Sequence, residues 1–475
     1  MKNSYLFLLI NTLSGMGYSL ASPLFPSLGK NGELDENILG WIISMYSLAA
    51  TILTPFVPYL TKKFSRIKLL IISTFLEAAC TLLYGFLNYF PSYYLLLITI
   101  FTLRIIHGLC SAIIGVLVYS LTISLTDENE VEYALGILEI GWSVGTCSGP
   151  LVASIFYKFG GYSLPFIFLG CILFISVFLA SQVHSGRLNK TDDEEQNPSF
   201  IRFLKYPKIF LILIGFIIVM ILASFYFPCL MNHLKDNYSL STSISSLFFV
   251  IPIASYIFIL QFLDYLTSKF GIYTIYTFGL IVSSISPPLL SPCPPIPKFI
   301  SIIIFGFLLN GIGQAPVFVP GLVALSYSIQ KIDPNIDELS VNDIASAINI
   351  LTIDIGEFVG PIIGGNLTSI YGFSYCCFSM FLIGSIFSCI FIAYFLSRMK
   401  REFKNLIKGH KNDVDISEDE SSARERLIDS QIISRSLSIL RESPWSFKFE
   451  VLSSRRNYKR RMTLRGQNMY ATFTN

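Results

Sequence analysis

The sequence predicts an all-α, multi-pass membrane protein whose twelve transmembrane helices form two related bundles of six. Three observations predict this fold class. The chain of 475 residues is 53% hydrophobic and only 14% charged, with a mean hydropathy of +0.61, whereas soluble domains carry about 25% charged residues. Its apolar runs are about 20 residues or longer, which suits membrane-crossing helices rather than the shorter alternating strands of a barrel. Motifs of the first half also recur in the second.

The apolar runs fall into two groups of six, and each run predicts one helix. In the first half they cover residues 4–28, 39–60, 68–89, 93–123, 132–157 and 163–183. In the second half they cover residues 207–231, 241–266, 271–290, 299–328, 341–370 and 373–397. The first run is too long for a removable signal peptide and lacks a small-residue cleavage site, so we expect the first helix to be retained.

Three pairs of similar segments indicate that one half is a copy of the other. The segments LASPLFPSL, YLTKKFS and GTCSGPLVAS return in the same order as LASFYFPCL, YLTSKFG and GEFVGPIIGG. Each returns about 200 residues later, which is the spacing expected of a duplicated six-helix unit. These pairs match helix 1 with 7, helix 2 with 8 and helix 5 with 11. Because an even number of spans separates the copies, both run in the same direction through the membrane.

The chain is expected to divide into four parts. These are an N-terminal bundle, a polar cytoplasmic linker, a C-terminal bundle and a basic tail, at residues 1–183, 184–206, 207–397 and 398–475. The tail contains SEDESS and RRNYKRRMTLR, which predicts disorder. Its basic end is either simply solvated and attracted to anionic lipid, or has a sorting or phosphoregulatory role, for instance at Ser417 or Ser438.

Basic residues predict the orientation of the helices. With a cytoplasmic N-terminus, most Lys and Arg residues fall in cytoplasmic segments, including the basic loop after the second helix. Of the 34 Lys and Arg residues, those on the opposite side are Lys30, Lys158, Lys235 and Lys298. This asymmetry follows the positive-inside rule, so we expect both termini to be cytoplasmic.

Two related six-helix units in parallel are typical of a transporter that rocks one bundle against the other. The sequence lacks the P-loop pattern G-x-x-x-x-G-K-[ST], so ATP is not the expected energy source. We therefore expect secondary transport rather than enzymatic activity. Nine cysteines without metal-binding spacing predict no metal site, and no cofactor is expected.

The fifth helix carries the pattern G-x8-G-x3-G-P at Gly136, Gly145, Gly149 and Pro150. A glycine stripe lets two helix backbones approach closely, and proline permits a bend. The pattern resembles that of proton-coupled antiporters of the major facilitator superfamily, which implies a packing and gating role. Tight packing alone is the other interpretation.

Further segments extend this resemblance over most of residues 5–397. YLTKKFSRIK, with Lys62, Lys63 and Arg66, resembles the loop signature of the superfamily, although Lys62 stands where the family has Asp. MGYSLASPLFPSL, LGILEIGWSVGTCSGP, FGGYSLPFIFLGCILF and FLLNGIGQAPVFVP look like the vesicular amine transporter group, and most of all its vesicular polyamine transporter branch. The resemblance implies exchange of protons for amines in an acidic vesicle.

Six ionisable residues fall at membrane depth, where each costs a few kcal/mol or more unless it faces a cavity or a partner. They are Glu77, Arg104, His107, Glu139, Asp354 and Glu357. Four acids against one permanent cation leave an excess of negative charge. The resulting site hypothesis is a cation-binding and proton-binding centre.

The eleventh helix presents two carboxylates on one face. Helical spacing places Asp354, Glu357 and Pro361 on this face, together with Ala347 and Ile350. A second face carries the glycines Gly356, Gly360 and Gly364 and is expected to pack against a neighbouring helix. Because acids one turn apart disfavour double ionisation, the pair should hold either a proton or a cation.

The other ionisable residues allow alternatives. Glu139 precedes Trp142 by three residues, so a bound ammonium group could meet a carboxylate and an aromatic ring together; the polyamine branch also carries Leu-Glu at Leu138 and Glu139. Alternatively, Glu139 pairs with Arg104. His107, one turn from Arg104, either relays protons or packs as a hydrogen-bonded histidine, and Glu77 is expected to be paired structurally.

These observations favour an alternating-access antiporter of protons and organic cations, such as polyamines or other amines. The expected partners are this small-molecule substrate, protons and the lipid bilayer, with no nucleic acid, and the protein is expected to be a monomer in a vesicle or endolysosomal membrane. Two alternatives remain: a transporter of a neutral or anionic solute, and a non-transporting receptor or scaffold with a signalling tail.

Overall fold

The computed structural model describes most of the chain. The described residues are 2–28, 34–126, 131–182, 200–291, 297, 299–334, 336 and 338–412. All structural statements below refer to these residues, and most of the predicted linker and tail lie outside them.

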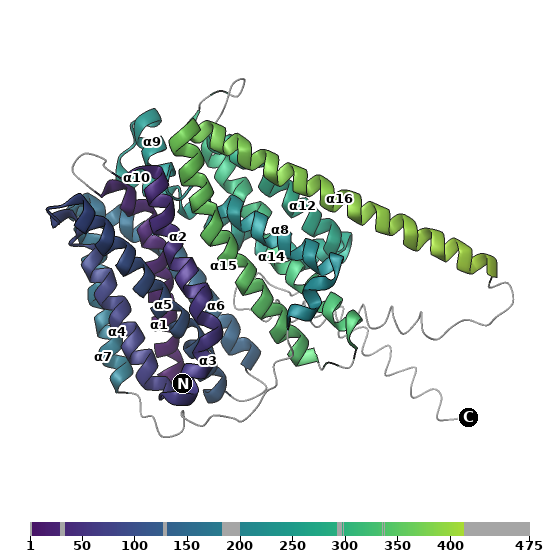
Figure 1. Cartoon of the computed structure of the whole chain (residues 1–475), viewed down its shortest axis with the longest axis horizontal. Helices are drawn as coiled ribbons and strands as arrows, with labels where there is room; N and C mark the ends of the chain where they lie inside the picture. The colour runs from purple at the N-terminus through teal and green to yellow at the C-terminus, as the bar shows by residue number, and fades with distance from the viewer. Residues whose placement is uncertain are drawn as a thin grey trace, which may run out of the picture.

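The first half of the chain forms a bundle of six long helices, at the left in Figure 1. They are α1 (Lys2–Leu24), α2 (Glu36–Leu53), α4 (Arg66–Tyr84), α5 (Tyr93–Leu125), α6 (Val131–Gly160) and α7 (Ser163–Ser181). The short helix α3 (Val57–Lys63) extends α2 beyond a single 3₁₀ turn at Thr54–Phe56. Pro55 and Pro58 follow the end of α2, and each removes a backbone donor, so the predicted single run 39–60 is interrupted there.

The second half forms a bundle of the same design. Its helices are α8 (Pro207–Ser224), α10 (Thr242–Leu247) with α11 (Val250–Phe270), α12 (Ile272–Ile285) with α13 (Pro287–Leu290), α14 (Ile300–Ile332), α15 (Glu338–Tyr371) and α16 (Phe373–Asn412). A short helix, α9 (Leu230–Tyr238), connects α8 with α10. In Figure 1 most of these helices lie at the right.

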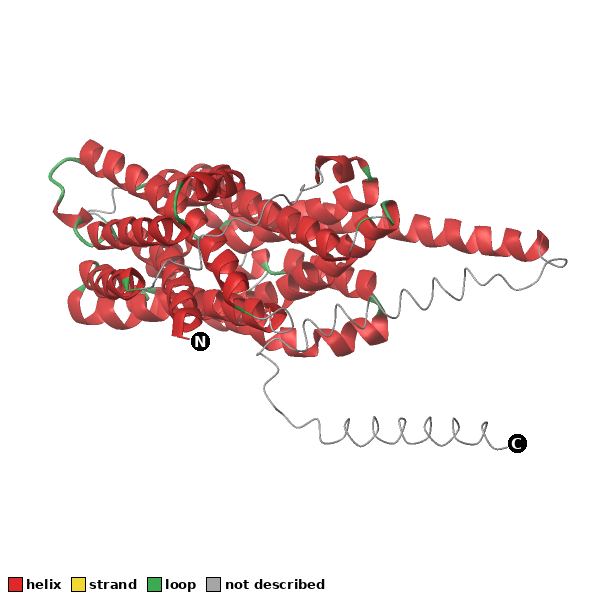
Figure 2. Cartoon of the chain, turned by 90° about the horizontal axis from the view of Figure 1, so that it is seen from below, coloured by secondary structure: helices red, strands yellow, loops and turns green. Residues whose placement is uncertain are grey.

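The predicted fold class is confirmed. Figure 2 shows only helices and loops in the described part of the chain. Ten of the helices or joined helix pairs are long and apolar enough to cross a membrane. The remaining two, α1 and α6, complete the two sets of six. They pack extensively against each other, and small residues are favoured at such contacts between membrane helices.

The last helix continues past the end predicted for it. The apolar span ends at Ser397 as predicted, but the helix itself continues to Asn412, where we expected the disordered tail. Residues 398–408 contain Arg, Lys, Met, Glu, Leu and Phe without Gly or Pro, so nothing in their local propensity stops the helix when the apolar run ends. In the linker, residues Phe200–Lys205 form a 3₁₀ helix just before α8.

The two halves pack their equivalent helices in the same way. In the first half, Gly145 and Gly149 of α6 lie against the backbone of α1 at Thr12 and Met16, where a Cβ atom would overlap. In the second half, Gly356, Gly360 and Gly364 of α15 lie against α8 in the same manner, and Gly364 contacts the carbonyl of Phe225. The repeated segments in the sequence therefore correspond to a repeated close contact between helices.

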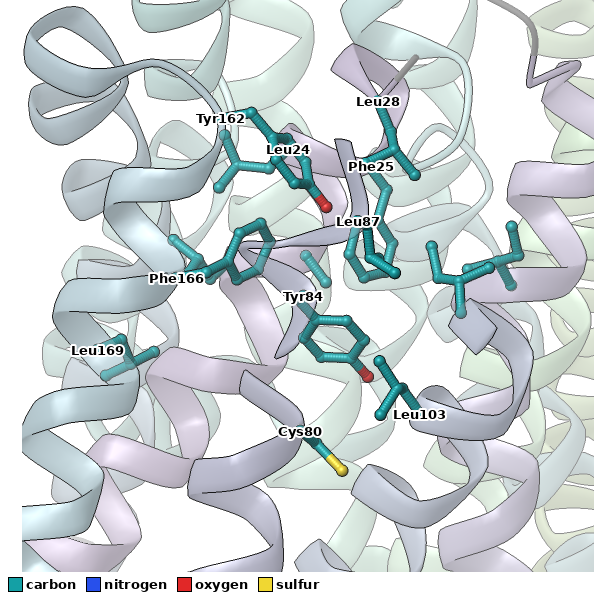
Figure 3. Close-up of a cluster of buried hydrophobic side chains, with 14 of the residues drawn as sticks. Leu24, Phe25, Leu28, Cys80, Tyr84, Leu87, Leu103, Tyr162, Phe166 and Leu169 are labelled. Atoms are coloured by element: carbon teal, nitrogen blue, oxygen red, sulfur yellow. The ribbon is translucent and has the colours of Figure 1, made fainter. Parts of the chain in front are cut away.

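Aromatic and aliphatic side chains fill the core of the first bundle beyond this contact. Figure 3 shows this cluster, in which the rings of Phe25, Tyr84, Tyr162 and Phe166 meet between α1, α4 and α7. The Phe25 and Phe166 ring centroids are 6.0 Å apart and those of Phe25 and Tyr84 are 5.2 Å apart. The cluster fixes the positions of α4 and α5, which carry the buried ionisable residues.

The two bundles meet closely at one end of the molecule and diverge at the other. At the closed end Gly40 of α2 packs on the backbone of Pro361, and Gly365 of α15 packs on the backbone of Glu36. Asn232 Nδ2 donates a hydrogen bond of 3.0 Å to Glu36 Oε1 there. Toward the end where α1 begins, α15 diverges from the first bundle (Figure 1), and Ile350 is 52% exposed. The two bundles are therefore farther apart on the side of the N-terminus than at the closed end.

Candidate functional site: a cavity between the bundles and a buried polar network

A cavity of about 240 Å³ lies between the two bundles. Each bundle contributes to its wall through α1 and α6 on one side, and α8, α11, α14 and α15 on the other. The side chains that line it are mostly aromatic or small and include Tyr18, Ser22, Trp142, Thr146, Pro150, Tyr226, Phe249, Tyr256, Gln314 and Glu357. Such a mixture of apolar surface with a few polar groups is typical of a small-molecule site.

Glu357 is the carboxylate that lines this cavity. It is half-buried on α15, and Ser47 Oγ of α2 donates a hydrogen bond of 3.2 Å to its Oε2 atom. The Tyr18 hydroxyl of α1 also lies within interaction range of this carboxylate. Among the described side chains, no Lys, Arg or His lies within ion-pair distance of it. Glu357 is therefore held by hydroxyl groups and leaves its charge available to a ligand.

Asp354 lies one turn before Glu357 and is also half-buried. The two carboxylates are close enough to influence each other electrostatically, although Asp354 does not line the cavity itself. Ala347 and Ile350, earlier on the same face, are exposed, whereas Pro361 is buried. The predicted stripe of α15 thus runs from the open end of the molecule, past the two acids, to the closed end.

Aromatic rings surround the position where a ligand would meet Glu357. The ring centroids of Tyr18 and Trp142 are 6.1 Å apart, and those of Tyr18 and Tyr46 are 5.0 Å apart. Trp142 and Tyr18 both line the cavity. Aromatic faces attract organic cations, so a carboxylate beside these rings matches the chemistry of an ammonium group.

Glu139 is exposed on α6 and does not line the cavity. Tyr119 of α5 donates a hydrogen bond of 2.7 Å to its Oε1 atom. Tyr256, a cavity residue of the other bundle, is within electrostatic range of it. The alternative pairing of Glu139 with Arg104 is wrong, because no ion pair joins them among the described residues and Arg104 hydrogen-bonds elsewhere.

Arg104 is fully buried inside the first bundle rather than in the cavity wall. Its Nε atom donates to the carbonyl of Ile42 at 3.2 Å, and one terminal nitrogen donates to the carbonyl of Ile43 at 2.9 Å. The guanidinium carbon lies 4.9 Å from the ring centroid of Tyr46 and 5.5 Å from that of Phe25. These contacts join α5 to α2 and assign a positioning role to Arg104.

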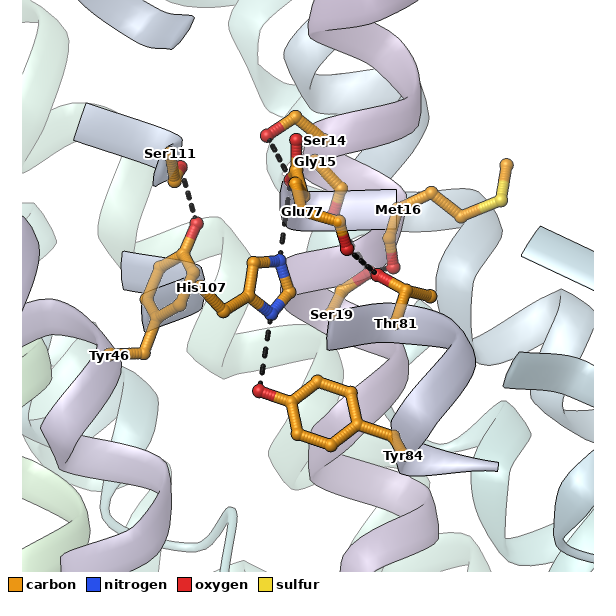
Figure 4. Close-up of polar contacts among 10 residues, drawn as sticks. All are labelled: Ser14, Gly15, Met16, Ser19, Tyr46, Glu77, Thr81, Tyr84, His107 and Ser111. Carbon is orange, nitrogen blue, oxygen red and sulfur yellow. Dashed lines mark hydrogen bonds and ion pairs between the residues drawn. The ribbon is translucent and has the colours of Figure 1, made fainter. Parts of the chain in front are cut away.

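His107 and Glu77 form a buried polar network close to Arg104, shown in Figure 4. Their nearest atoms, His107 Nε2 and Glu77 Oε1, are 3.3 Å apart, and both side chains are fully buried. Ser14 Oγ donates 2.6 Å to the same Glu77 oxygen, and the Tyr84 hydroxyl lies 3.4 Å from His107 Nδ1. The expectation that Glu77 is paired within the protein agrees with this arrangement.

The remaining predicted residues occupy packing or surface positions. Gly136 is half-buried in α6, and Pro150 is buried and lines the cavity. In the loop signature, Lys63 is exposed with its Nζ atom 5.9 Å from the ring centroid of Phe64, and Arg66 begins α4. The side chain of Lys62 lies outside the described residues.

Sequence reasoning missed the hydroxyl groups that hold the acids. Tyr18, Ser47 and Tyr256 each lie in the middle of an apolar run, away from the interfacial positions where tyrosine is usual in membrane helices, whereas Tyr119 lies near the end of its run. Polar side chains inside an apolar run are the sequence signal that could have identified these residues. The described residues contain no group of three or more His, Cys, Asp or Glu side chains that could hold a metal ion.

Two six-helix bundles that enclose a cavity between them and diverge at one end define the class as a membrane transporter. The model of the Major Facilitator Superfamily matches residues 7–333. The chain belongs to this superfamily and is therefore a multi-pass membrane transporter and not an enzyme.

Individual relatives agree with this class. The MFS-type transporter SLC18B1 of Mus musculus is 26% identical over 372 residues, which cover 76% of this chain and 78% of that protein. This similarity confirms the resemblance inferred from the motifs. Among solved structures, a bacterial homologue of the human lysosomal transporter Spinster, inward-facing and occupied, has a TM-score of 0.67 and 13% identity and covers 84% of this chain and 96% of its own. A mutant of the nucleoside transporter NupG has a TM-score of 0.66 and 13% identity, covering 82% and 99%. At such identities these structures show the fold alone.

Proposed function

We propose that this transporter exchanges protons for organic cations, such as polyamines or other amines, by alternating access. The observation that carries the proposal is Glu357, a carboxylate in the cavity wall beside aromatic rings and without a cationic partner among the described side chains. An ionised carboxylate at membrane depth costs a few kcal/mol or more. Either a proton or an ammonium group removes this cost, so the two ligands compete for the same negative charge.

Asp354 strengthens this competition. Two carboxylates one turn apart repel each other when both are ionised, so the pair accepts either a proton or a cationic ligand readily. A ligand with an ammonium group would face Glu357 and place its apolar part against the rings of Tyr18 and Trp142. The similarity to SLC18B1 and the motifs shared with the vesicular amine transporter group support the same substrate class.

The direction of transport follows if the termini are cytoplasmic, as the distribution of basic residues indicates. The two bundles diverge on the side where α1 begins, so we infer that this conformation is open to the cytoplasm. In a vesicle or endolysosomal membrane with an acidic lumen, protons leaving the lumen would drive amines into it. We propose that a monomer carries this activity, because the cavity lies between two bundles of the same chain.

The test is flux in reconstituted proteoliposomes with an imposed pH gradient. We expect labelled spermidine to accumulate on the acidic side, and Glu357→Gln to weaken amine affinity about ten- to hundredfold, since a hydrogen bond to a charged group contributes about 1.5–3 kcal/mol. Asp236→Asn, the same chemical change at an exposed residue of α9, is the matched control and should behave like the wild type. Gradient-driven uptake of a neutral or anionic solute instead of amines would overturn the proposal.

A further inference from the structure

The first bundle contains an ionisable pair that the cavity does not use. Glu77 of α4 and His107 of α5 are both 0% exposed and neither lines the cavity. Glu77 Oε1 lies 3.3 Å from His107 Nε2 and accepts a hydrogen bond of 2.6 Å from Ser14 (Figure 4). Because ionisable side chains inside membrane spans are costly, a buried pair of this kind is a candidate functional site.

The pair has unused hydrogen-bonding capacity. Glu77 Oε2 is buried and makes no hydrogen bond, and the same is true of Arg104 Nη1 one turn before His107. A buried polar atom without a partner costs about 1–3 kcal/mol. A proton bound to His107 would turn its contact with Glu77 into a charge-assisted hydrogen bond, which is stronger than a neutral one. Glu77 therefore keeps one oxygen free to accept a hydrogen bond, and its carboxylate would stabilise a protonated imidazole.

The groups around the pair favour a single proton-binding unit. The titratable or charged groups that face Glu77 and His107 lie on α2, α4 and α5. They are Tyr46, Cys80, Tyr84, Arg104 and Cys110. From α1, Ser14 and Gly17 face it without ionisable groups. Among these described neighbours Glu77 meets no second carboxylate, so His107 has one acidic partner.

Residues of α1 and α2 that contact this pair are next in sequence to residues at the cavity. Gly17 of α1 faces His107, where a Cβ atom would lie 3.5 Å from Nε2, and the next residue, Tyr18, lines the cavity. On α2 the ring centroid of Tyr46 lies 5.1 Å from that of His107, and the next residue, Ser47, hydrogen-bonds to Glu357. Neighbouring residues of α1 and α2 thus contact both acidic centres, so a change at one can be transmitted to the other.

We propose that Glu77 and His107 form a proton-binding site of the first bundle, separate from the amine-binding site at Glu357. The imidazole takes one proton from water on one side of the membrane and returns it to water on the other side after the bundles have rocked, and no other bond forms or breaks. This inference rests on the proposed function, because it assigns the coupling proton to one centre and the amine to the other.

The first test reads the imidazole directly, without transport. The full-length protein, with labelled histidine, is placed in lipid nanodiscs, and its four histidines are followed by NMR as pH changes. The signal lost in His107→Gln should report both a neutral and a protonated imidazole as the pH is changed. Its midpoint should move in Glu77→Gln. A signal that does not titrate, or a midpoint that Glu77→Gln leaves unchanged, overturns the inference.

The second test measures coupling in proteoliposomes. Each exchanged proton multiplies amine accumulation about tenfold per pH unit of gradient. His107→Gln should therefore accumulate labelled spermidine about tenfold less than the wild type at a gradient of about one pH unit, while exchange of labelled for unlabelled spermidine at equal pH persists. His233→Gln, on α9 outside the bundle core, is the matched control. Wild-type accumulation by His107→Gln overturns the inference.

The two experiments distinguish a failure of the proposed function from a failure of this inference, and further variants cover the case in which a mutant does not fold. If the wild type itself accumulates no amine, the proposed function fails, and the NMR titration alone decides whether this pair binds a proton. If His107→Gln does not fold, Ser14→Ala and Tyr84→Phe keep both ionisable groups and remove only a hydroxyl partner of each. These variants should move the titration midpoint of His107, and an unmoved midpoint in both overturns the inference.

Discussion

The two bundles share a backbone design but differ in where they place ionisable groups. Gly108 of α5 packs on the carbonyl of Tyr46, and Gly311 of α14 packs on that of Pro252, so equivalent helices approach each other at equivalent points. The residues just before these glycines differ. His107 contacts Glu77, whereas Asn310 Nδ2 donates 3.0 Å to the carbonyl of Leu222. The first bundle has a charged core, and the second has a neutral one.

The reverse holds at the interface between the bundles. The repeats GTCSGPLVAS and GEFVGPIIGG align Thr146 with Glu357, and Ser143, two residues before the first repeated glycine, with Asp354. Thr146, Ser143 and Glu357 all line the cavity. At these aligned positions the first bundle thus offers hydroxyl groups to the cavity, and the second offers the carboxylate of Glu357. Close packing tolerates little change, whereas polar positions are free to diverge after a duplication, so the glycines were retained and the charges were redistributed.

The largest effect should come from filling the shared backbone contacts. Gly108→Val and Gly311→Val each place a branched side chain where the structure leaves no room for a Cβ atom. Overpacking costs about 1–3 kcal/mol in ordinary cores, and more where backbone rather than side chains must move. Both variants should lose most of their folded yield on size-exclusion chromatography in detergent. Full tolerance of one of them would show that the two contacts are not equivalent.

A large but unequal effect should come from the residues four positions before these glycines. Arg104→Met removes two charge-assisted hydrogen bonds to carbonyls of α2, and we expect the free energy of unfolding to fall by about 3–5 kcal/mol. Phe307→Leu, at the equivalent position of α14, should lower the free energy of unfolding by about 1–2 kcal/mol because packing contacts are lost. Thermal unfolding of the purified variants would compare them. Equal losses would contradict a charged core on one side only.

A moderate effect on amine affinity should distinguish the cavity wall formed by the first bundle from the wall formed by the second. Asp354→Asn removes a charge beside Glu357, and we expect a loss of about 1 kcal/mol in amine binding, or about fivefold in affinity. Ser143→Ala, at the equivalent position of α6, removes only a hydroxyl group and should change affinity less than about twofold. Binding of labelled spermidine measures both variants. A larger loss for Ser143→Ala would assign the cation site to the first bundle instead.

The smallest dependence on pH should be found in the neutral core of the second bundle. Asn310→Ala removes one hydrogen bond to the carbonyl of Leu222 and another from Gln314, and a neutral hydrogen bond contributes about 1 kcal/mol. Its unfolding temperature should therefore fall slightly, and equally at about pH 5.5 and pH 7.5, because neither amide titrates in this range. A loss that depends on pH would show that ionisable groups act in this core as well.

Helix-level features were predictable because they depend on local composition. Hydropathy and run length identified the spans, and the repeated segments identified the two halves. The breaks at Thr54–Phe56 and the continuation of α16 to Asn412 were missed, because an apolar run marks where lipid can be tolerated and not where a helix begins or ends. The glycine face of α15 was predicted from spacing alone, since one face of a helix follows from its period.

The sequence by itself determined the fold class, the duplication and which helices carry acids, since these follow from composition and periodicity along the chain. Only the tertiary structure decided the partners. Arg104 binds carbonyls of α2 rather than Glu139, Glu77 meets His107, and Glu357 faces the cavity held by Ser47. Each of these pairs joins two different helices, and the crossing of the helices, which no local pattern encodes, decides which buried groups come within hydrogen-bonding distance.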